Sequence, residues 1–231
     1  MTIIHRRALN RLEPVLKQFG YQKPTFSQAL LDRGYYDYNL TKGYHSFQLN
    51  ITDWRVHDVL SPFLCLWIGV PHPERFMIYT ANLQNVADSL LFETYWPRER
   101  LDDLLYLGLN VVCETPYVAS LRNRLQSPVM QAAFNSLLTA QDSFYLFSDS
   151  TYGFQYGVAL AEPLERRATL WLNAAEQFAS VFDDPASLPV AQRERAKDSS
   201  AINLALLTGL LVIGSICLLF VLAWLLSGVS P

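Results

Sequence analysis

The sequence predicts an α+β fold: a cytosolic domain with a small antiparallel sheet and several helices, followed by one C-terminal transmembrane helix. Three observations lead to this prediction. Residues 34–80 carry apolar and aromatic side chains that alternate with polar ones, which is typical of strands. Several later segments carry apolar residues at three- and four-residue spacing, which is typical of helices. Residues 204–226 contain no charged side chain.

Composition indicates a folded chain and argues against nucleic-acid binding. The 231 residues include 18 Lys and Arg against 21 Asp and Glu, a formal net charge of −3, so a basic surface for phosphates is not expected. Hydrophobic residues make up 51% of the chain and charged residues 17%, which excludes disorder as the main state. The three cysteines, Cys65, Cys113 and Cys217, match neither a disulfide framework nor a zinc-site spacing.

The strands are expected in two groups. An antiparallel meander is predicted over residues 34–80, and the apolar run 62–70 forms its buried strand. Residues 75–79 are expected to pair with that run across a turn at 71–74. A separate hairpin is expected from residues 144–147 and 154–160.

Six helices are expected from the spacing of apolar residues and from the positions of proline and glycine. They cover residues 5–19, 83–95, 97–107, 116–125, 128–140 and 164–182. Pro14 is expected to interrupt the first helix and Gly20 to cap its end. Pro97 and Gly108 are read as the start and the end of the third. The last helix has the strongest apolar stripe, formed by Leu164, Ala168, Trp171, Ala175, Phe178 and Phe182.

The C-terminal part is predicted to anchor the domain in a membrane. Ten of the 23 residues from 204 to 226 are Leu, and a helix of this length spans about 34 Å, enough for a hydrocarbon core of about 30 Å. Arg193, Arg195 and Lys197 precede the run, which places the N-terminal side in the cytoplasm by the positive-inside rule. We therefore expect a cytosolic domain at 1–184, a linker at 185–200, a transmembrane helix at 201–227 and a non-cytoplasmic tail at 228–231. In a bacterium the membrane would be the inner membrane.

Candidate catalytic and metal-binding residues are few. Asp53, His57 and Asp58 form the closest approach to an acid–base cluster, but a turn or a surface ion pair explains them better. Cys65 and Cys113 lie in apolar surroundings typical of inert buried thiols, and His72 between two prolines indicates a turn. The four histidines do not have the spacing of metal ligands, so no metal is predicted. The sequence contains no nucleotide-binding or hydrolase motif, so neither a cofactor nor an enzyme is predicted.

Two groups of residues are candidates for partner binding. Tyr35, Tyr36 and Tyr38 are close together, and at least one should point outward, because successive residues of a strand face opposite sides. The alternative is that these aromatic side chains pack in the sheet. Ala205 and Gly209 lie on one face of the predicted span, where small residues allow close helix contact with a membrane-embedded protein or with a second copy of the chain.

The layout, a cytosolic domain ahead of one C-terminal span, resembles that of the DotU-type proteins of type VI secretion systems. Those proteins have an all-helical cytosolic domain, whereas residues 44–80 here indicate strands, so the resemblance concerns architecture and carries over no functional residues. The expected function is protein binding at the cytoplasmic face of a membrane, as a structural or accessory subunit of a complex such as a secretion machine. The alternatives are a membrane-held immunity or inhibitor protein against a toxin, and a membrane-tethered enzyme with a dispersed site.

Overall fold

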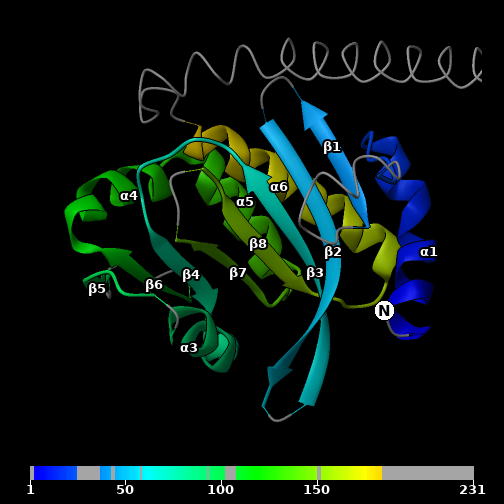
Figure 1. The fold of residues 1–231 in the computed structure, drawn as a ribbon, viewed down its shortest axis with the longest axis horizontal. Coiled ribbons are helices and arrows are strands. Elements are labelled where there is room, and N and C mark those ends of the chain that lie inside the picture. The colour runs from blue at the N-terminus through cyan, green and yellow to red at the C-terminus, as the bar shows by residue number, and fades with distance from the viewer. Residues whose placement is uncertain are drawn as a thin grey trace, which may run out of the picture. The chain divides into compact units, whose positions relative to one another are not determined.

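The computed structural model describes residues 3–24, 37–42, 45–57, 59–92, 94–101, 108–149 and 152–183. It confirms the α+β class, but the sheet is not small: it contains eight strands (Figure 1). These are β1 (Tyr38–Lys42), β2 (His45–Val56), β3 (Val59–Gly69), β4 (Phe76–Thr80), β5 (Arg98–Arg100), β6 (Leu109–Glu114), β7 (Phe144–Ser148) and β8 (Phe154–Ala159). They are antiparallel throughout and lie in the order β1-β2-β3-β8-β7-β4-β6-β5.

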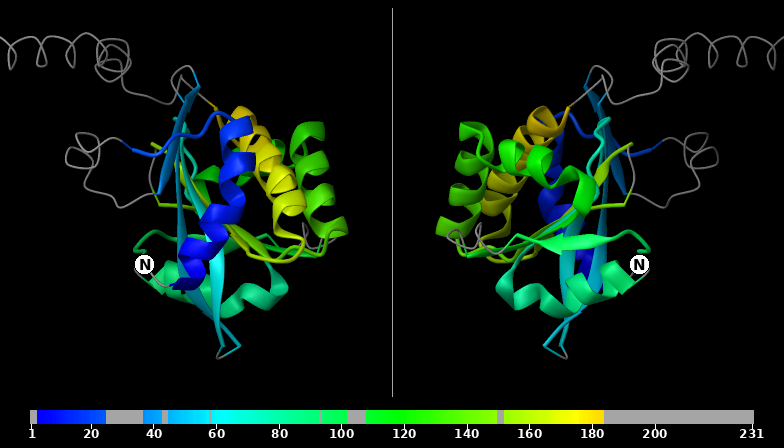
Figure 2. Two further views of the ribbon diagram at one scale, coloured as in Figure 1. Left: turned by 90° about the vertical axis from the view of Figure 1, so that its right-hand side faces the viewer. Right: turned by 90° about the vertical axis from the view of Figure 1, so that its left-hand side faces the viewer.

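The helices cover both faces of the sheet. They are α1 (Ile3–Gln18), α3 (Gln84–Phe92), α4 (Val118–Leu125), α5 (Pro128–Thr139) and α6 (Leu164–Phe182), with 3-10 turns η1 (Ala81–Leu83) and η3 (Thr115–Tyr117). Figure 2 shows α1, α5 and α6 together on one face, where they and α4 bury the larger core. Helix α3 packs on the opposite face in a second, smaller core.

The two cores follow from the alternation of side chains along the strands. In β3, Leu64, Leu66 and Ile68 enter the larger core, while Phe63 and Cys65 enter the smaller one. All five side chains are buried. A strand that is covered on both faces reads as a continuous apolar run, which is why this segment was recognisable in the sequence.

The predicted pairing of residues 75–79 with residues 62–70 is wrong. Strand β3 pairs with β2 and β8, whereas β4 pairs with β6 and β7. The connection at 71–75 is therefore a crossover to the other half of the sheet. Its residues His72 and Glu74 are completely buried, unlike those of an exposed hairpin turn.

The prediction of a helix that starts at Pro97 is also wrong for its first residues. Arg98–Arg100 form β5, an exposed edge strand paired with β6. Residues 102–107 lie outside the described part. Gly108 has a positive φ of 71°, a conformation that favours glycine.

The other expected helices and the second hairpin are confirmed, except that the helix expected at 83–95 ends at Phe92. Helix α6 has the expected bounds, and α5 begins at Pro128 behind Ser127, whose hydroxyl accepts a hydrogen bond from Met130 N. The expected interruption at Pro14 is wrong, because α1 continues through Pro14 to Gln18; Gly20, with φ 87°, follows the end of the helix as expected.

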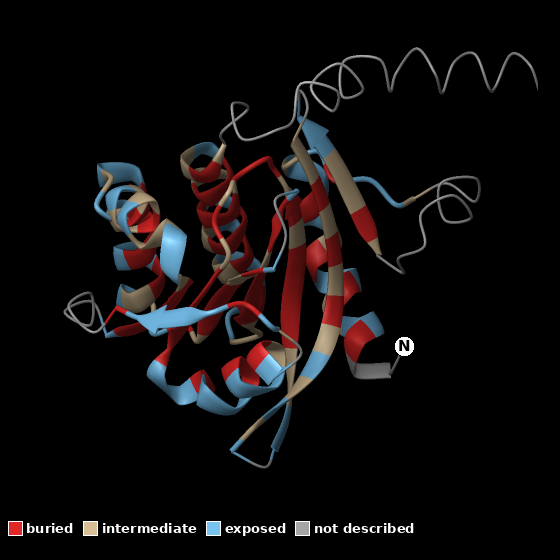
Figure 3. Cartoon of the chain, turned by 60° about the vertical axis from the view of Figure 1, so that its left-hand side comes forward, coloured by how far each residue is buried: buried red, intermediate tan, exposed pale blue. Residues whose placement is uncertain are grey.

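The β2–β3 hairpin projects beyond the body of the domain (Figure 3). Val59 and Leu60 near its tip are 64% and 66% exposed. Closer to the body, Trp54 and Val56 pack against the smaller core, so only the tip carries exposed apolar side chains.

The predicted transmembrane helix at 201–227, the linker and the tail lie outside the described residues. Within the described part, no helix has both the length and the apolar character needed to cross a bilayer.

Candidate functional site

The residues proposed from sequence as an acid–base cluster do not form one. Asp53 Oδ1 lies 2.9 Å from His5 Nε2 on α1, so this carboxylate joins the sheet to a helix. His57 occupies the hairpin turn with a positive φ of 46°. Asp58 lies outside the described residues. The interpretation as an ion pair and a turn is confirmed for Asp53 and His57.

Both described cysteines are buried, as expected. Burial raises the pKa of the Cys65 thiol, and burial, reinforced by the carboxylates of Glu74, Glu114 and Glu99, raises the pKa of Cys113 to about 12. Neither thiol supplies a thiolate near neutral pH, so neither is a candidate nucleophile.

Ser148, His72 and Glu74 lie next to one another inside the larger core, in the order serine, histidine, carboxylate. His72 Nε2 is 3.3 Å from Ser148 Oγ, and His72 Nδ1 is 3.7 Å from Glu74 Oε2. All three residues are 0% exposed, and the His72 ring packs against Phe154 and Phe182 at centroid distances of 5.8 and 5.6 Å. A substrate cannot reach a serine in this position, so the arrangement is structural.

Glu74 is held in this core as an anion by hydrogen bonds. Arg124 Nε and the Ser120 hydroxyl both donate to its Oε1, at 2.6 and 2.5 Å. Burial alone would raise the pKa of Glu74, but the nearby His72 ring and the hydrogen bonds from Ser120 and Arg124 outweigh burial and lower the pKa to about 2. Arg124 also donates to Val181 O at 2.6 Å, which fastens the end of α6 to α4.

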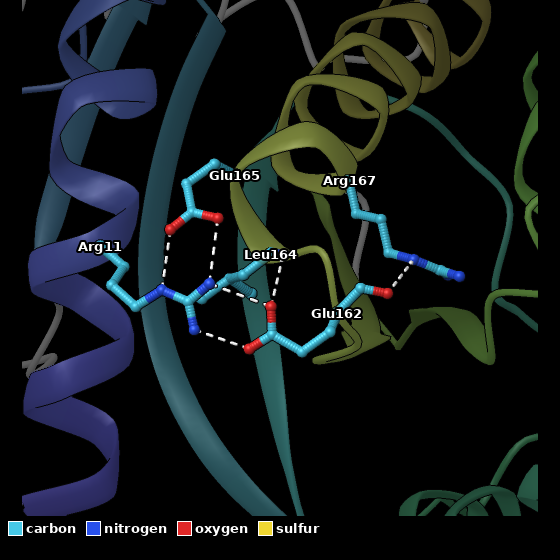
Figure 4. A network of polar contacts seen from close by, with 5 residues as sticks. All are labelled: Arg11, Glu162, Leu164, Glu165 and Arg167. Carbon is cyan, nitrogen blue, oxygen red and sulfur yellow. Dashed lines mark hydrogen bonds and ion pairs between the residues drawn. The ribbon is translucent and has the colours of Figure 1, made fainter.

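The guanidinium of Arg11 on α1 is paired with two carboxylates. It bonds to both oxygens of Glu162 and of Glu165, at 2.6 to 3.0 Å, and so joins α1 to the start of α6 (Figure 4). The Glu162 carboxylate also accepts from Leu164 N at 3.0 Å. Hydrogen bonds from Arg11 and Leu164 lower the pKa of Glu162 to about 2.

The candidate functional site is a pocket between the α3–β5 connection and the ends of β4, β6 and β7. We call it the Trp96 pocket. It has a volume of about 360 Å³ and is lined by Arg75, Thr94, Tyr95, Trp96, Pro97, Glu114 and Asp149. No sequence pattern marks these residues as one site, because they come from four separate stretches of the chain.

Backbone hydrogen bonds hold the segments around this pocket in place. Glu114 N donates to Arg75 O at 2.9 Å, which fixes the end of β6 to the start of β4. Thr115 N donates to Pro97 O at 3.1 Å, which fixes the connection to the same end of β6. The walls of the pocket are therefore tied to a sheet rather than carried on a free loop.

Two residues that line the Trp96 pocket each carry a buried polar atom without a hydrogen-bond partner. Trp96 is 8% exposed, and its Nε1 has no hydrogen-bond partner in the structure. Glu114 Oε2 is likewise buried and unpartnered, while Oε1 lies 3.5 Å from Arg75 Nη1. A buried polar group that makes no hydrogen bond costs about 1–3 kcal/mol, so a ligand that pairs with such a group recovers this cost.

An exposed aromatic side chain, that of Tyr95, lies at the rim of the pocket. Thr94 lies just after α3, and its amide and hydroxyl both donate to Leu91 O, at 3.2 and 2.8 Å. The chain then turns and leaves Tyr95 99% exposed, next to Trp96; Phe92, at the end of α3, is 86% exposed. Large exposed aromatic residues are enriched where proteins bind partners.

The described structure has a second groove, between α5 and α6. Two adjoining hollows of about 450 and 360 Å³ share Ser136 and Leu170 there. No unpartnered buried polar atom of the described residues belongs to its lining, so it offers less to a specific ligand than the Trp96 pocket does.

Of the residues proposed from sequence for partner binding, the structure describes only Tyr38. It is 2% exposed, pairs with Leu49 between β1 and β2, and lies under Lys23 Nζ at 5.6 Å from the ring centroid. Tyr38 is therefore part of the core, and an outward-pointing tyrosine would have to be Tyr35 or Tyr36. Tyr35, Tyr36, Ala205 and Gly209 lie outside the described residues, so their roles remain predictions.

The fold and the pocket together define an α+β domain that carries a polar pocket with an aromatic rim on the outer part of its sheet. No family model, no curated protein and no solved structure matches the chain. Within the described ranges, no group of three His, Cys, Asp or Glu side chains could hold a metal ion.

Proposed function

We propose that the protein is a membrane-anchored binding subunit, which captures a protein partner at the cytoplasmic face of a membrane. The observation that carries the proposal is the rim of the Trp96 pocket, where Tyr95 is 99% exposed beside a pocket with unpartnered polar groups. An aromatic anchor next to a recess with polar groups is the arrangement typical of binding hot spots.

The buried polar clusters support binding rather than catalysis. Glu74, His72 and Ser148 are occupied in holding α4 and α6 against the sheet, and the thiols of Cys65 and Cys113 are buried. The apolar sequence at 204–226 supports attachment to a bilayer. The subunit would then hold its partner within the length of the linker from the membrane.

Co-purification from detergent-solubilised membranes tests the proposal. The full chain should retain a protein partner that is lost with Tyr95→Ala and retained with Val129→Ala. Val129 is the matched control because it is also exposed, at 44%, but lies on α5 against the opposite face of the sheet. An unchanged set of co-purified proteins with Tyr95→Ala, at unchanged thermal stability, would reject the proposal.

A further inference from the structure

The two unpartnered groups of the Trp96 pocket define a hydrogen-bonding pattern. The indole Nε1 of Trp96 can only donate, and Glu114 Oε2, as a carboxylate oxygen, can only accept. A ligand that fits both must therefore offer one acceptor and one donor. A peptide provides both, through its carbonyl groups and through the N–H groups of its main chain or side chains.

The charges at the pocket favour a cationic donor. Arg75 contributes one positive charge, and Glu114 and Asp149 contribute two negative charges, so the lining carries one net negative charge. Arg75 approaches only Oε1 of Glu114, at 3.5 Å, and leaves Oε2 unmatched. A carboxylate guest would be attracted by Arg75 but repelled by both anions, whereas an ammonium or guanidinium group would be repelled by Arg75 but attracted by both anions.

The rim suits the stem of a basic side chain. Lysine and arginine carry an aliphatic stem below the charge, and both stem and cation pack favourably against an aromatic ring. Tyr95 is 99% exposed, so it can close over a guest without giving up a packed contact. The unpartnered atoms of Trp96 and Glu114 are out of contact with solvent, so binding to them requires the neighbouring side chains to move aside.

We propose that the Trp96 pocket binds a lysine or arginine side chain presented by a peptide segment of the protein partner. The cation donates to Glu114 Oε2 and to Asp149, a peptide carbonyl accepts from Trp96 Nε1, and the stem lies against Tyr95. This inference rests on the protein-binding function proposed above and names the chemistry that the site recognises.

The indole N–H signal of Trp96 provides the test, recorded by NMR on the full chain in detergent micelles. The chain has five Trp, and Trp96→Phe identifies the signal. The probe is a capped alanine peptide with one central lysine. The matched controls are the same peptide with norleucine, which keeps the stem and lacks the charge, and with glutamate. We expect a saturable shift of the Trp96 signal with the lysine peptide alone.

Two variants complete the test. Glu114→Gln should weaken binding of the lysine peptide about tenfold or more, because it removes a charged hydrogen-bond acceptor. Glu99→Gln makes the same change on the exposed strand β5 and should leave the affinity unchanged. If Glu114→Gln unfolds the domain, seen as movement of the signal of buried Trp171, then Asp149→Asn at an exposed position takes its place and should also weaken binding.

The inference is overturned if the lysine peptide gives no saturable shift, if the norleucine peptide binds equally well, or if the folded pocket variants bind like the parent. A partner that co-purifies in a Tyr95-dependent manner while the lysine peptide fails to bind would reject this inference and leave the protein-binding function standing.

Discussion

Arg124 Nε lies 2.6 Å from Oε1 of Glu74, whose side chain is completely buried between α4 and the sheet. The same guanidinium donates through Nη1 to Val181 O near the end of α6. One arginine therefore both neutralises a buried carboxylate and fastens the helix after which the chain continues towards the predicted anchor.

Replacing Arg124 with alanine should destabilise the domain strongly. The change leaves Glu74 as a buried charge without its cation, which typically costs about 3–5 kcal/mol. Chemical denaturation of the parent and the variant measures the difference in the free energy of unfolding. Arg166→Ala removes the same charge from an exposed position on α6 and should change it by less than about 0.5 kcal/mol. Equal effects of the two substitutions would contradict the role given to Arg124.

Glu74 should also contribute to the acid sensitivity of the fold. Its pKa is lowered from an ordinary value of 4.5 to about 2 in the folded state. A lowered pKa stabilises the fold above pH 4.5, and this contribution is lost as the pH falls from 4.5 towards 2. We expect Glu74→Gln to be less stable than the parent at neutral pH and the difference to narrow in acid. A difference independent of pH between 6 and 3 would show that Glu74 titrates normally.

Gly157 on β8 should not accept a side chain while Tyr145 occupies the neighbouring strand. A Cβ atom at Gly157 would lie 2.2 Å from Cε1 and 2.3 Å from Cζ of the Tyr145 ring. The ring is buried and its hydroxyl accepts a hydrogen bond from Trp54 Nε1 at 3.2 Å, so it has little freedom to move. Gly157→Ala should therefore cost about 1–3 kcal/mol or more.

A double-mutant cycle provides the control for this clash. Tyr145→Leu shortens the side chain, so Gly157→Ala should cost much less in that background than in the parent. Additive losses in the free energy of unfolding would mean that the alanine acts through the backbone of β8 rather than through the ring.

The predicted anchor can be tested separately from the pocket. Deleting residues 201–231 should move the protein from the membrane fraction to the soluble fraction, because these residues contain the uncharged run at 204–226. A reporter active only in the cytoplasm should work when fused before residue 1 and fail when fused after residue 231. A truncated protein that still sediments with membranes would place the attachment elsewhere.

The elements predicted well from the sequence are those whose pattern is local. Helix α6 carries its apolar stripe over 19 residues, and α5 begins with a proline behind a capping serine, so nearby residues determine both. The hairpin of β7 and β8 is local as well. Strand pairing between distant segments is different: β8 occupies the edge of β3 that was expected to bind residues 75–79, and nothing near Pro71 indicates this.

The candidate site could not be predicted for the same reason. Trp96 and Glu114 come together because β5 and β6 pair, and Arg75 and Asp149 join them because β4 lies between β6 and β7. The unpartnered state of Trp96 Nε1 is a property of the packed structure alone. The one local signal is the aromatic pair Tyr95 and Trp96 directly before Pro97, which the spacing of apolar residues places at the boundary between two predicted helices.

Site-specific photocrosslinking in cells tests the central claim, protein binding at the Trp96 pocket, most directly. A photoreactive phenylalanine replaces Tyr95 in one protein and Val129 in another; both positions are exposed, but they lie on opposite faces of the sheet. We expect a discrete adduct of higher mass, containing one partner protein, from position 95 and not from position 129. The absence of any adduct from position 95, or the same set of adducts from both positions, would contradict the account.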